Sequence, residues 1–435
     1  MDQKPYIRAG DKYLYTDIIK IDHEYIRIGT FPQISKHLNE LKIKTKYIIL
    51  LPPVITLAGD NYTGEEFVIW NMIYKKETSS PNIYIGDKKY VRYLYHRLKY
   101  TVNQTFNIAK TRIVKRNSIK KFFKGTYIKP DTHYKLNDRV RIYYGISNIQ
   151  IFYKDRLLYD WQENNPSLNI HKKIAQLLIP YKKSFFGPFN SLSIIPLGSG
   201  NGFHGHTSNF IIQYASRNIW VDVMAKPFLA LRKINFPWDN ITDYFISHVH
   251  EDHIEGFSSI LEYASIRNKP VNLITTFRIF KQLEKIYTFL FPDFNDLVNH
   301  INIIPHSTLP YYHGYLTVRL SHHVLRSGTL GLKIRYKNNV FALSGDTFYS
   351  EEFEKKHPQC TSVDSSWYND CDLIFHEVEF FKKDTVHTYY TEIKKLQNKL
   401  NGKILVYHNS SDKFLLPGVK EYNQYIIKNG EIEIK

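Results

Sequence analysis

Residues 245–256 read FISHVHEDHIEG, and this short stretch decides how the rest of the chain is interpreted. The apolar residues 244–246 predict a buried strand that leads directly into the polar cluster. His248 and His250 lie two positions apart, so in extended backbone their side chains point to the same side. The stretch therefore predicts a pair of imidazoles at the end of a strand.

Asp252 and His253 follow on the turn into a helix that we expect over residues 257–265. Two imidazoles plus an imidazole–carboxylate pair can fill the ligand shells of two adjacent metal ions. Neutral imidazole and carboxylate suit zinc, and they also suit iron and manganese. The alternative is a group of ordinary surface histidines, against which their position directly after a strand argues.

The motif resembles that of the metallo-β-lactamase fold superfamily, which implies an α/β protein with an αββα sandwich. The resemblance also implies further ligands at later strand ends. One of them falls on His322 or His323, and the period-2 alternation of the preceding strand favours His322. Asp346, in the turn S-G-D-T, matches the bridging aspartate of the family, and His408 ends another apolar strand.

Two later segments resemble the ribonuclease Z-like branch of this superfamily. Residues 375–380 read FHEVEF and are similar to its H-E-A-T motif, while residues 386–388 read VHT and are similar to its following histidine motif. The resemblance implies that Glu377 orients His387, which would protonate the leaving oxygen. An imidazole held by a carboxylate is a suitable general acid near neutral pH.

The implied reaction is hydrolysis of a phosphodiester bond with the help of two divalent ions. Zinc is the first expectation, with manganese or iron as alternatives. The implied ligands of one ion are His248, His250 and His322. Those of the other ion are Asp252, His253 and His408, with Asp346 bridging the two. The candidate catalytic residues are Asp252, His387 and Glu377.

The first half of the chain repeats the strand pattern of the second half without its metal motif. Residues 47–59 align without gaps on residues 244–256, which puts Leu51 and Pro53 in the places of His248 and His250. We therefore expect a tandem duplication, with a degenerate metallo-β-lactamase-like domain over 1–185 and a catalytic domain over 186–435. The two would form a pseudo-dimer within one chain.

Two features of the sequence bear on the substrate class, and they favour different substrates. The transfer-RNA-processing relatives carry a long arm before the S-G-D-T turn, whereas here residues 335–339 form a tight hairpin. That departure favours smaller substrates such as cyclic nucleotides. A net charge of +18 and the basic residues of the stretch 110–124 favour RNA, although such a stretch is also typical of a solvated face. We expect RNA or a nucleotide as the substrate.

Composition sets the remaining limits. The 435 residues include only two cysteines, which excludes a disulfide framework and suits the cytoplasm. The N-terminus does not read as a signal peptide, and no window is apolar enough for a transmembrane helix, so no membrane partner is expected. Two other functions stay open: a metal-dependent hydrolase of another ester, and a non-catalytic scaffold that binds metal.

Overall fold

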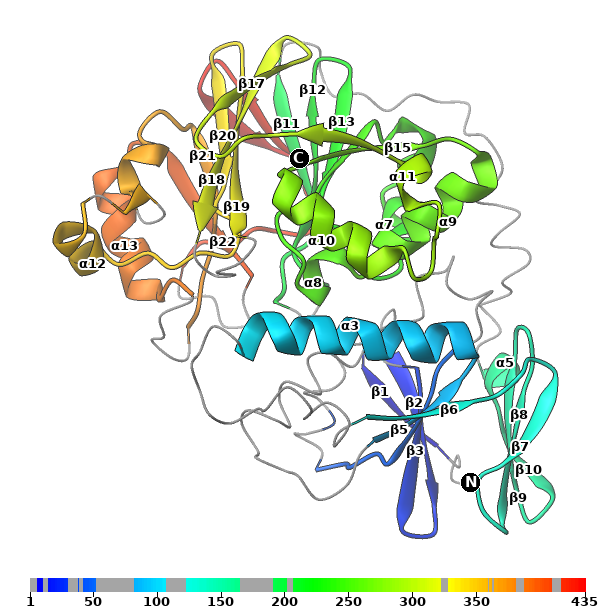
Figure 1. The fold of residues 1–435 in the computed structure, drawn as a ribbon. Coiled ribbons are helices and arrows are strands. Elements are labelled where there is room, and N and C mark those ends of the chain that lie inside the picture. The colour runs from blue at the N-terminus through cyan, green and yellow to red at the C-terminus, as the bar shows by residue number, and fades with distance from the viewer. Residues whose placement is uncertain are drawn as a thin grey trace.

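The described residues of the computed structural model form four β-sheets and the helices that cover them (Figure 1). The sheets fall into two pairs, one from each half of the chain. The described residues are 6–10, 15–29, 38, 42–51, 82–106, 123–164, 191–201, 206–321, 328–358, 360–361, 364–380, 387–408 and 416–435.

The N-terminal half contributes a six-stranded and a four-stranded sheet. The first has the order β1-β2-β3-β4-β5-β6, antiparallel from β1 to β3 and parallel from β3 to β6. The second is antiparallel, in the order β10-β9-β8-β7. The bounds are β1 Tyr6–Gly10, β2 Tyr15–Ile21, β3 Glu24–Ile28, β4 Tyr47–Ile49, β5 Asn82–Gly86, α3 Lys88–Phe106, β6 Phe123–Tyr127, β7 Thr132–Lys135, β8 Val140–Tyr144, β9 Ile149–Tyr153, β10 Arg156–Asp160 and α5 Trp161–Asn164.

The C-terminal half contributes an eight-stranded sheet, in the order β16-β15-β14-β13-β12-β11-β23-β24, and a six-stranded sheet, in the order β17-β18-β19-β20-β21-β22. The strand bounds are β11 Leu192–Gly198, β12 Asn209–Tyr214, β13 Arg217–Val221, β14 Asp243–Phe245, β15 Val271–Thr275, β16 Val298–Asn302, β17 Thr308–Tyr311, β18 Gly314–Ser321, β19 Thr329–Tyr336, β20 Asn339–Leu343, β21 Leu373–Glu377, β22 Lys403–Tyr407, β23 Tyr425–Lys428 and β24 Glu431–Ile434. The helices are α7 Pro227–Lys233, η4 Trp238–Asn240, α8 Glu251–Ile254, α9 Phe257–Arg267, α10 Phe277–Tyr287, α11 Phe294–Leu297, α12 Glu351–Lys356, η6 Ser365–Tyr368 and α13 Tyr390–Lys399.

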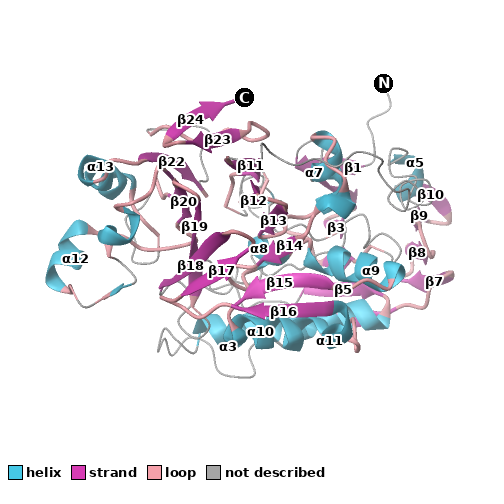
Figure 2. Cartoon of the chain, turned by 90° about the horizontal axis from the view of Figure 1, so that it is seen from above, coloured by secondary structure: helices cyan, strands magenta, loops and turns pink. Residues whose placement is uncertain are grey.

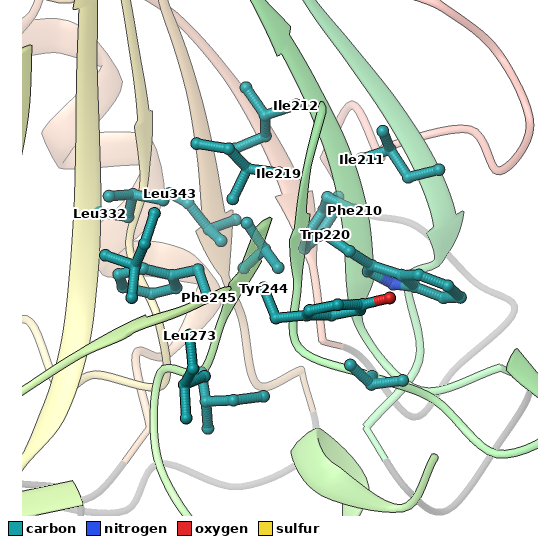
Figure 3. Close-up of a cluster of buried hydrophobic side chains, with 14 of the residues drawn as sticks. Phe210, Ile211, Ile212, Ile219, Trp220, Tyr244, Phe245, Leu273, Leu332 and Leu343 are labelled. Atoms are coloured by element: carbon teal, nitrogen blue, oxygen red, sulfur yellow. The ribbon is translucent and has the colours of Figure 1, made fainter. Parts of the chain in front are cut away.

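The two C-terminal sheets pack face to face around a buried apolar layer (Figure 3). Phe210 of β12 reaches across this layer, with its ring 5.6 Å from that of Phe375 on β21. On the other face of the first sheet, Tyr244 contacts Phe257 of α9, with ring centroids 6.3 Å apart. Helix α13 covers the outer face of the six-stranded C-terminal sheet. There Ile393 of α13 packs in a second apolar cluster, separate from the layer between the sheets. This is the predicted αββα metallo-β-lactamase sandwich.

The order of the first ten strands repeats that of the next ten. Strands β1 to β6 and β11 to β16 both run antiparallel for three strands and then parallel, and in each half four consecutive antiparallel strands follow, β7 to β10 and β17 to β20. Equivalent backbone details recur as well. Gly29 and Asp222 both have positive φ, and their N–H groups donate to the carbonyls of Ile49 and Phe245. The duplication expected from the sequence is therefore present in the fold.

The structure corrects the predicted alignment between the halves by one residue. Strand pairing places Ile49 opposite Ile28 and Phe245 opposite Val221, so Ile49 corresponds to Phe245. The gapless alignment instead matched Ile49 with Ile246. Leu51 therefore corresponds to Ser247 and not to His248. The positions that correspond to the histidine motif begin at residue 52, outside the described residues.

Helix α3 joins the two halves. It follows β5 as α10 follows β15, and the two helices lie against each other (Figures 1 and 2). The ring of Tyr93 on α3 stacks on Tyr287 of α10 with centroids 6.4 Å apart. Farther along α3, the ring of His96 lies 4.9 Å from that of Phe289. The two halves thus share an apolar contact across this helix pair.

Several local expectations are confirmed. The helix expected over 257–265 is α9, and the tight hairpin joins β19 to β20, where Tyr336 pairs with Asn339. In the part of the chain that the structure describes, no helix is long and apolar enough to cross a membrane. The predicted domain boundary at 185/186 and most of the basic stretch 110–124 lie outside the described residues.

Candidate metal centre

The histidine motif lies at the C-terminal end of the parallel strand β14. His248 and His250 occupy the segment after the strand, and Asp252 and His253 belong to α8, a separate short helix that precedes the expected helix α9. His248 is fully buried and His253 is 2% exposed. Gly256 lets this segment lie against the preceding loop, because a Cβ there would lie 2.0 Å from the carbonyl oxygen of Met224.

Two further strand ends bring Asp346 and His408 to the same place. Asp346 follows β20, and Gly345 before it has a φ of +62° and no room for a side chain beside the carbonyl of Leu330. His408 follows β22 with a φ of 56°, in the left-handed region that residues other than glycine adopt only uncommonly. Its N–H donates to the carbonyl of Ser199 at 2.7 Å, which holds that conformation.

Four ligand atoms converge from these segments. His253 Nε2 lies 3.6 Å from Asp252 Oδ2 and 3.4 Å from Asp346 Oδ2. His408 Nε2 lies 3.5 Å and 3.3 Å from the same two oxygens. Ligands at about 2.0–2.1 Å from one tetrahedral ion lie roughly 3.3–3.4 Å apart, so these four nitrogen–oxygen distances suit ligands of a zinc-type ion.

The second predicted group shares Asp346 with the first. His248 Nε2 lies 3.7 Å from Asp346 Oδ2, and one ligand atom from each of His248, His250 and Asp346 can be chosen within 4.8 Å of the others. Asp346 therefore lies between both groups, in the place expected of a bridging ligand. The remaining candidates for this group, His322 and His323, lie outside the described residues, so the choice between them stays a prediction.

Asp222 supports the centre from behind, a role that the sequence did not reveal. Its carboxylate accepts hydrogen bonds from the N–H and the hydroxyl of Ser247, both at 2.8 Å. It also lies 2.7 Å from His253 Nδ1, which leaves Nε2 as the atom that faces the cluster. The only sequence signal was an aspartate at the end of strand β13. Such partners fix the orientation of ligating imidazoles.

Asp346 and His250 have the protonation states that metal binding requires. Burial would raise the pKa of Asp346, but the imidazoles of His408 and His253 outweigh it and hold that pKa well below its ordinary value. Burial lowers the pKa of His250 to about 4, against the attraction of Asp252 and Asp346. The carboxylate is therefore ionised and His250 is neutral near pH 7, the forms in which both groups bind metal.

His387 and Glu377 lie beside this centre, as the sequence predicted. His387 Nδ1 is 3.0 Å from Glu377 Oε2, and the ring of His387 lies 5.4 Å from that of His408. Glu377 is fully buried at the end of β21, and Oε1 accepts hydrogen bonds from the N–H groups of Thr347 and Thr388. His387 can thus donate a proton at the centre, and its distance to Asp346 and His408 also fits a ligand.

Fold and site together define the class of the protein, a metallo-β-lactamase fold protein with residues placed to hold metal. Residues 192–429, more than half of the chain, match the family described as Anti-Pycsar protein Apyc1. The chain belongs to this family.

The chain is similar to further proteins over smaller parts or at lower identity. Ribonuclease Z of Alkaliphilus oremlandii (strain OhILAs) is 36% identical over 88 residues, which are 19% of this chain and only 28% of that protein. The short form of human tRNase Z (ELAC1) is 13% identical, with 53% of this chain and 98% of that chain covered and a TM-score of 0.42. A long-form RNase Z from yeast is 12% identical, with 94% and 68% covered and a TM-score of 0.40.

Proposed function

We propose that the chain is a hydrolase that cleaves phosphodiester bonds in RNA or nucleotides with two divalent metal ions, zinc before manganese or iron. One ion would be held by His248, His250 and His322. The other would be held by Asp252, His253 and His408, and Asp346 would be a ligand of both ions. The convergence of the four side chains proposed for this second ion, with the histidine nitrogens 3.3–3.6 Å from the two carboxylate oxygens, is the observation that carries the proposal.

Two such ions, when bound, activate a water molecule as the nucleophile and neutralise the charge that develops on the phosphoryl oxygens. The protein supplies the proton for the leaving group. Two backbone N–H groups donate hydrogen bonds to Glu377, and Glu377 in turn binds Nδ1 of His387. Nε2 of His387 would then donate the proton to the leaving oxygen. A general acid positioned in this way typically contributes 10²- to 10⁴-fold to the rate.

Two features bear on the size of the substrate. The net charge of +18 favours a polyanion such as RNA, and the name of the similar Ribonuclease Z supports the same choice. The tight turn between Tyr336 and Asn339 leaves no arm at this position, which favours a small substrate and makes a cyclic-nucleotide phosphodiesterase the second candidate. Cys360 and Cys371 form no disulfide bond with each other, which fits our proposal of a cytoplasmic site of action.

A metal analysis combined with a substrate panel tests the proposal. The panel would contain labelled RNA, cyclic nucleotides, bis(p-nitrophenyl) phosphate, a carboxylic ester and a β-lactam. We expect about two ions per chain and cleavage of phosphodiesters only, with both lost in Asp252→Ala and His250→Ala. Asp370→Asn is the matched control, because Asp370 pairs with Lys333 and precedes β21, at the opposite end of that strand from Glu377.

The outcomes separate the candidate functions. Cleavage of RNA that falls steeply with salt supports RNA, and cleavage confined to cyclic nucleotides supports the second candidate. Turnover of the carboxylic ester or the β-lactam without phosphodiester cleavage would show a different hydrolase. Metal-loaded protein that leaves every compound intact would contradict enzymatic activity and favour a metal-binding scaffold.

A further inference from the structure

The half of the chain without the histidine motif contacts the metal-binding segment directly. Arg97 lies on α3 and is 2% exposed. Its Nη2 donates a hydrogen bond of 3.0 Å to the carbonyl oxygen of Val249. Val249 stands between His248 and His250, so this contact holds the peptide unit between Val249 and His250.

The burial of Arg97 sets it apart from other basic residues on the same helix. Lys89 and Arg92 are exposed, as expected for long charged side chains on a helix surface. A guanidinium loses its hydration when buried, and that loss is compensated only by hydrogen bonds to acceptors inside the protein. The carbonyl of Val249 is such an acceptor, and it belongs to the segment on which the site depends.

A second buried arginine of the same half acts on the next residues. Arg27 of β3 is fully buried, and Glu251, which directly follows His250, is 2% exposed. Burial lowers the pKa of Arg27 to about 10, while Tyr84 and Glu251 act in the opposite direction through their charge. The hydrogen bond from Arg97 thus ties Val249 to the N-terminal half, and the charge of Glu251 acts on Arg27 of the same half.

We propose that Arg97 is a positioning residue of the metal centre, through which the N-terminal half sets the spacing of the imidazoles of His248 and His250. The inference rests on the proposed function, because it needs metal at these two residues. A displacement of the Val249 carbonyl rotates the peptide units on either side. The two imidazoles then no longer converge with Asp346, from which His248 Nε2 is now 3.7 Å away.

The test compares Arg97→Met and Arg97→Lys with Arg92→Met, a control on the exposed side of the same helix. Three measurements are made on the full chain: affinity for Zn²⁺ against a competing chelator, the absorption spectrum with Co²⁺, and Tm with and without Zn²⁺. Loss of a partner that orients ligands typically weakens metal binding about 10- to 100-fold. We expect a loss of this size in Arg97→Met, a changed Co²⁺ spectrum and a smaller rise of Tm on adding Zn²⁺.

A purely structural role for Arg97 predicts a different pattern. Tm would then fall equally with and without Zn²⁺, and the affinity and the Co²⁺ spectrum would match the wild type; this result overturns the inference. Arg97→Lys keeps a buried cation with fewer donors, so it should recover part of the affinity. If Arg97→Met does not fold, Arg97→Lys decides: weaker binding supports the inference, and wild-type binding overturns it.

The same experiment separates this inference from the proposed function. Wild-type protein that binds neither Zn²⁺ nor Co²⁺ would contradict the metal centre itself and the role of Arg97 with it. Wild-type protein that binds both ions, beside a folded Arg97 variant that binds them equally well, would overturn the role of Arg97 alone.

Discussion

The carboxylate of Glu377 lies 3.0 Å from Nδ1 of His387 and is fixed on its other oxygen by two backbone N–H groups. The side chain of His387 is 22% exposed, so a substrate can reach it, whereas that of Glu377 is fully buried. A proton donor for a leaving group needs such a fixed orientation together with access to the substrate.

The first prediction concerns this pair. His387→Gln should lower kcat by about 10²- to 10⁴-fold on RNA or cyclic nucleotides, whose leaving oxygen needs a proton. On bis(p-nitrophenyl) phosphate the loss should be small, because p-nitrophenolate leaves without one. Steady-state kinetics on both substrates and a metal analysis check this. Equal losses on both substrates together with loss of metal would show that His387 is a ligand instead.

The second prediction concerns Asp346, which lies between the two groups of ligands. Asp346→Asn keeps the size of the side chain but removes the charge that the surrounding imidazoles stabilise. We expect a loss of at least about 100-fold in metal affinity and in activity, because both ions lose a ligand. Metal titration measures this, with Asp370→Asn as the control. Retention of two tightly bound ions in Asp346→Asn would contradict the bridging role.

The third prediction concerns the stability that Arg27 and Glu251 share. Arg27→Met removes the buried cation whose pKa the charge of Glu251 raises, and it should therefore lower the free energy of unfolding. The double variant Arg27→Met/Glu251→Gln should recover a large part of that loss. Urea unfolding measures both, with the exposed Arg139→Met as the control. Simple addition of the two single effects would show that the residues do not interact.

The fourth prediction concerns Glu262 on α9. Burial raises its pKa to about 7 against the opposing charge of Lys89 on α3. The folded state therefore binds the proton of Glu262 more tightly than the unfolded state. The resulting contribution to the free energy of unfolding is complete below pH 4.5 and is lost as the pH rises through 7. Glu262→Gln should raise the free energy of unfolding by up to about 3 kcal/mol at pH 8 and have little effect at pH 4.5. Urea unfolding at the two pH values checks this, and an equal effect at both would contradict it.

Much of the centre could be predicted from the sequence because its ligands follow strands in a fixed order. His248, His250, Asp252 and His253 are contiguous, and the apolar strand before them shows where they lie. Asp346 and His408 were predicted by their positions in the order of the family's ligand sites. The structure brings all six together, and the Glu377–His387 pair lies beside them.

Contacts between distant segments could not be predicted in the same way. Nothing in the sequence of α3 distinguishes Arg97 from Arg92 as the buried residue, because both are basic residues on one helix. The role of Asp222 depends on the position of His253 across two strand ends. The predicted alignment of the two halves was shifted by one residue, because the register depends on which residues pair between strands. The sequence does not distinguish Ile48 from Ile49, whereas in the sheet they pair with different residues, Arg27 and Ile28.

The contact of α3 with α10 is made within one polypeptide. Two halves on separate chains would associate to an extent that depends on protein concentration, whereas here each half is held at a high effective concentration near the other. Dilution cannot separate Arg97 from the carbonyl of Val249. The specific activity of the protein should therefore stay constant as it is diluted, even at concentrations at which separate subunits would have dissociated.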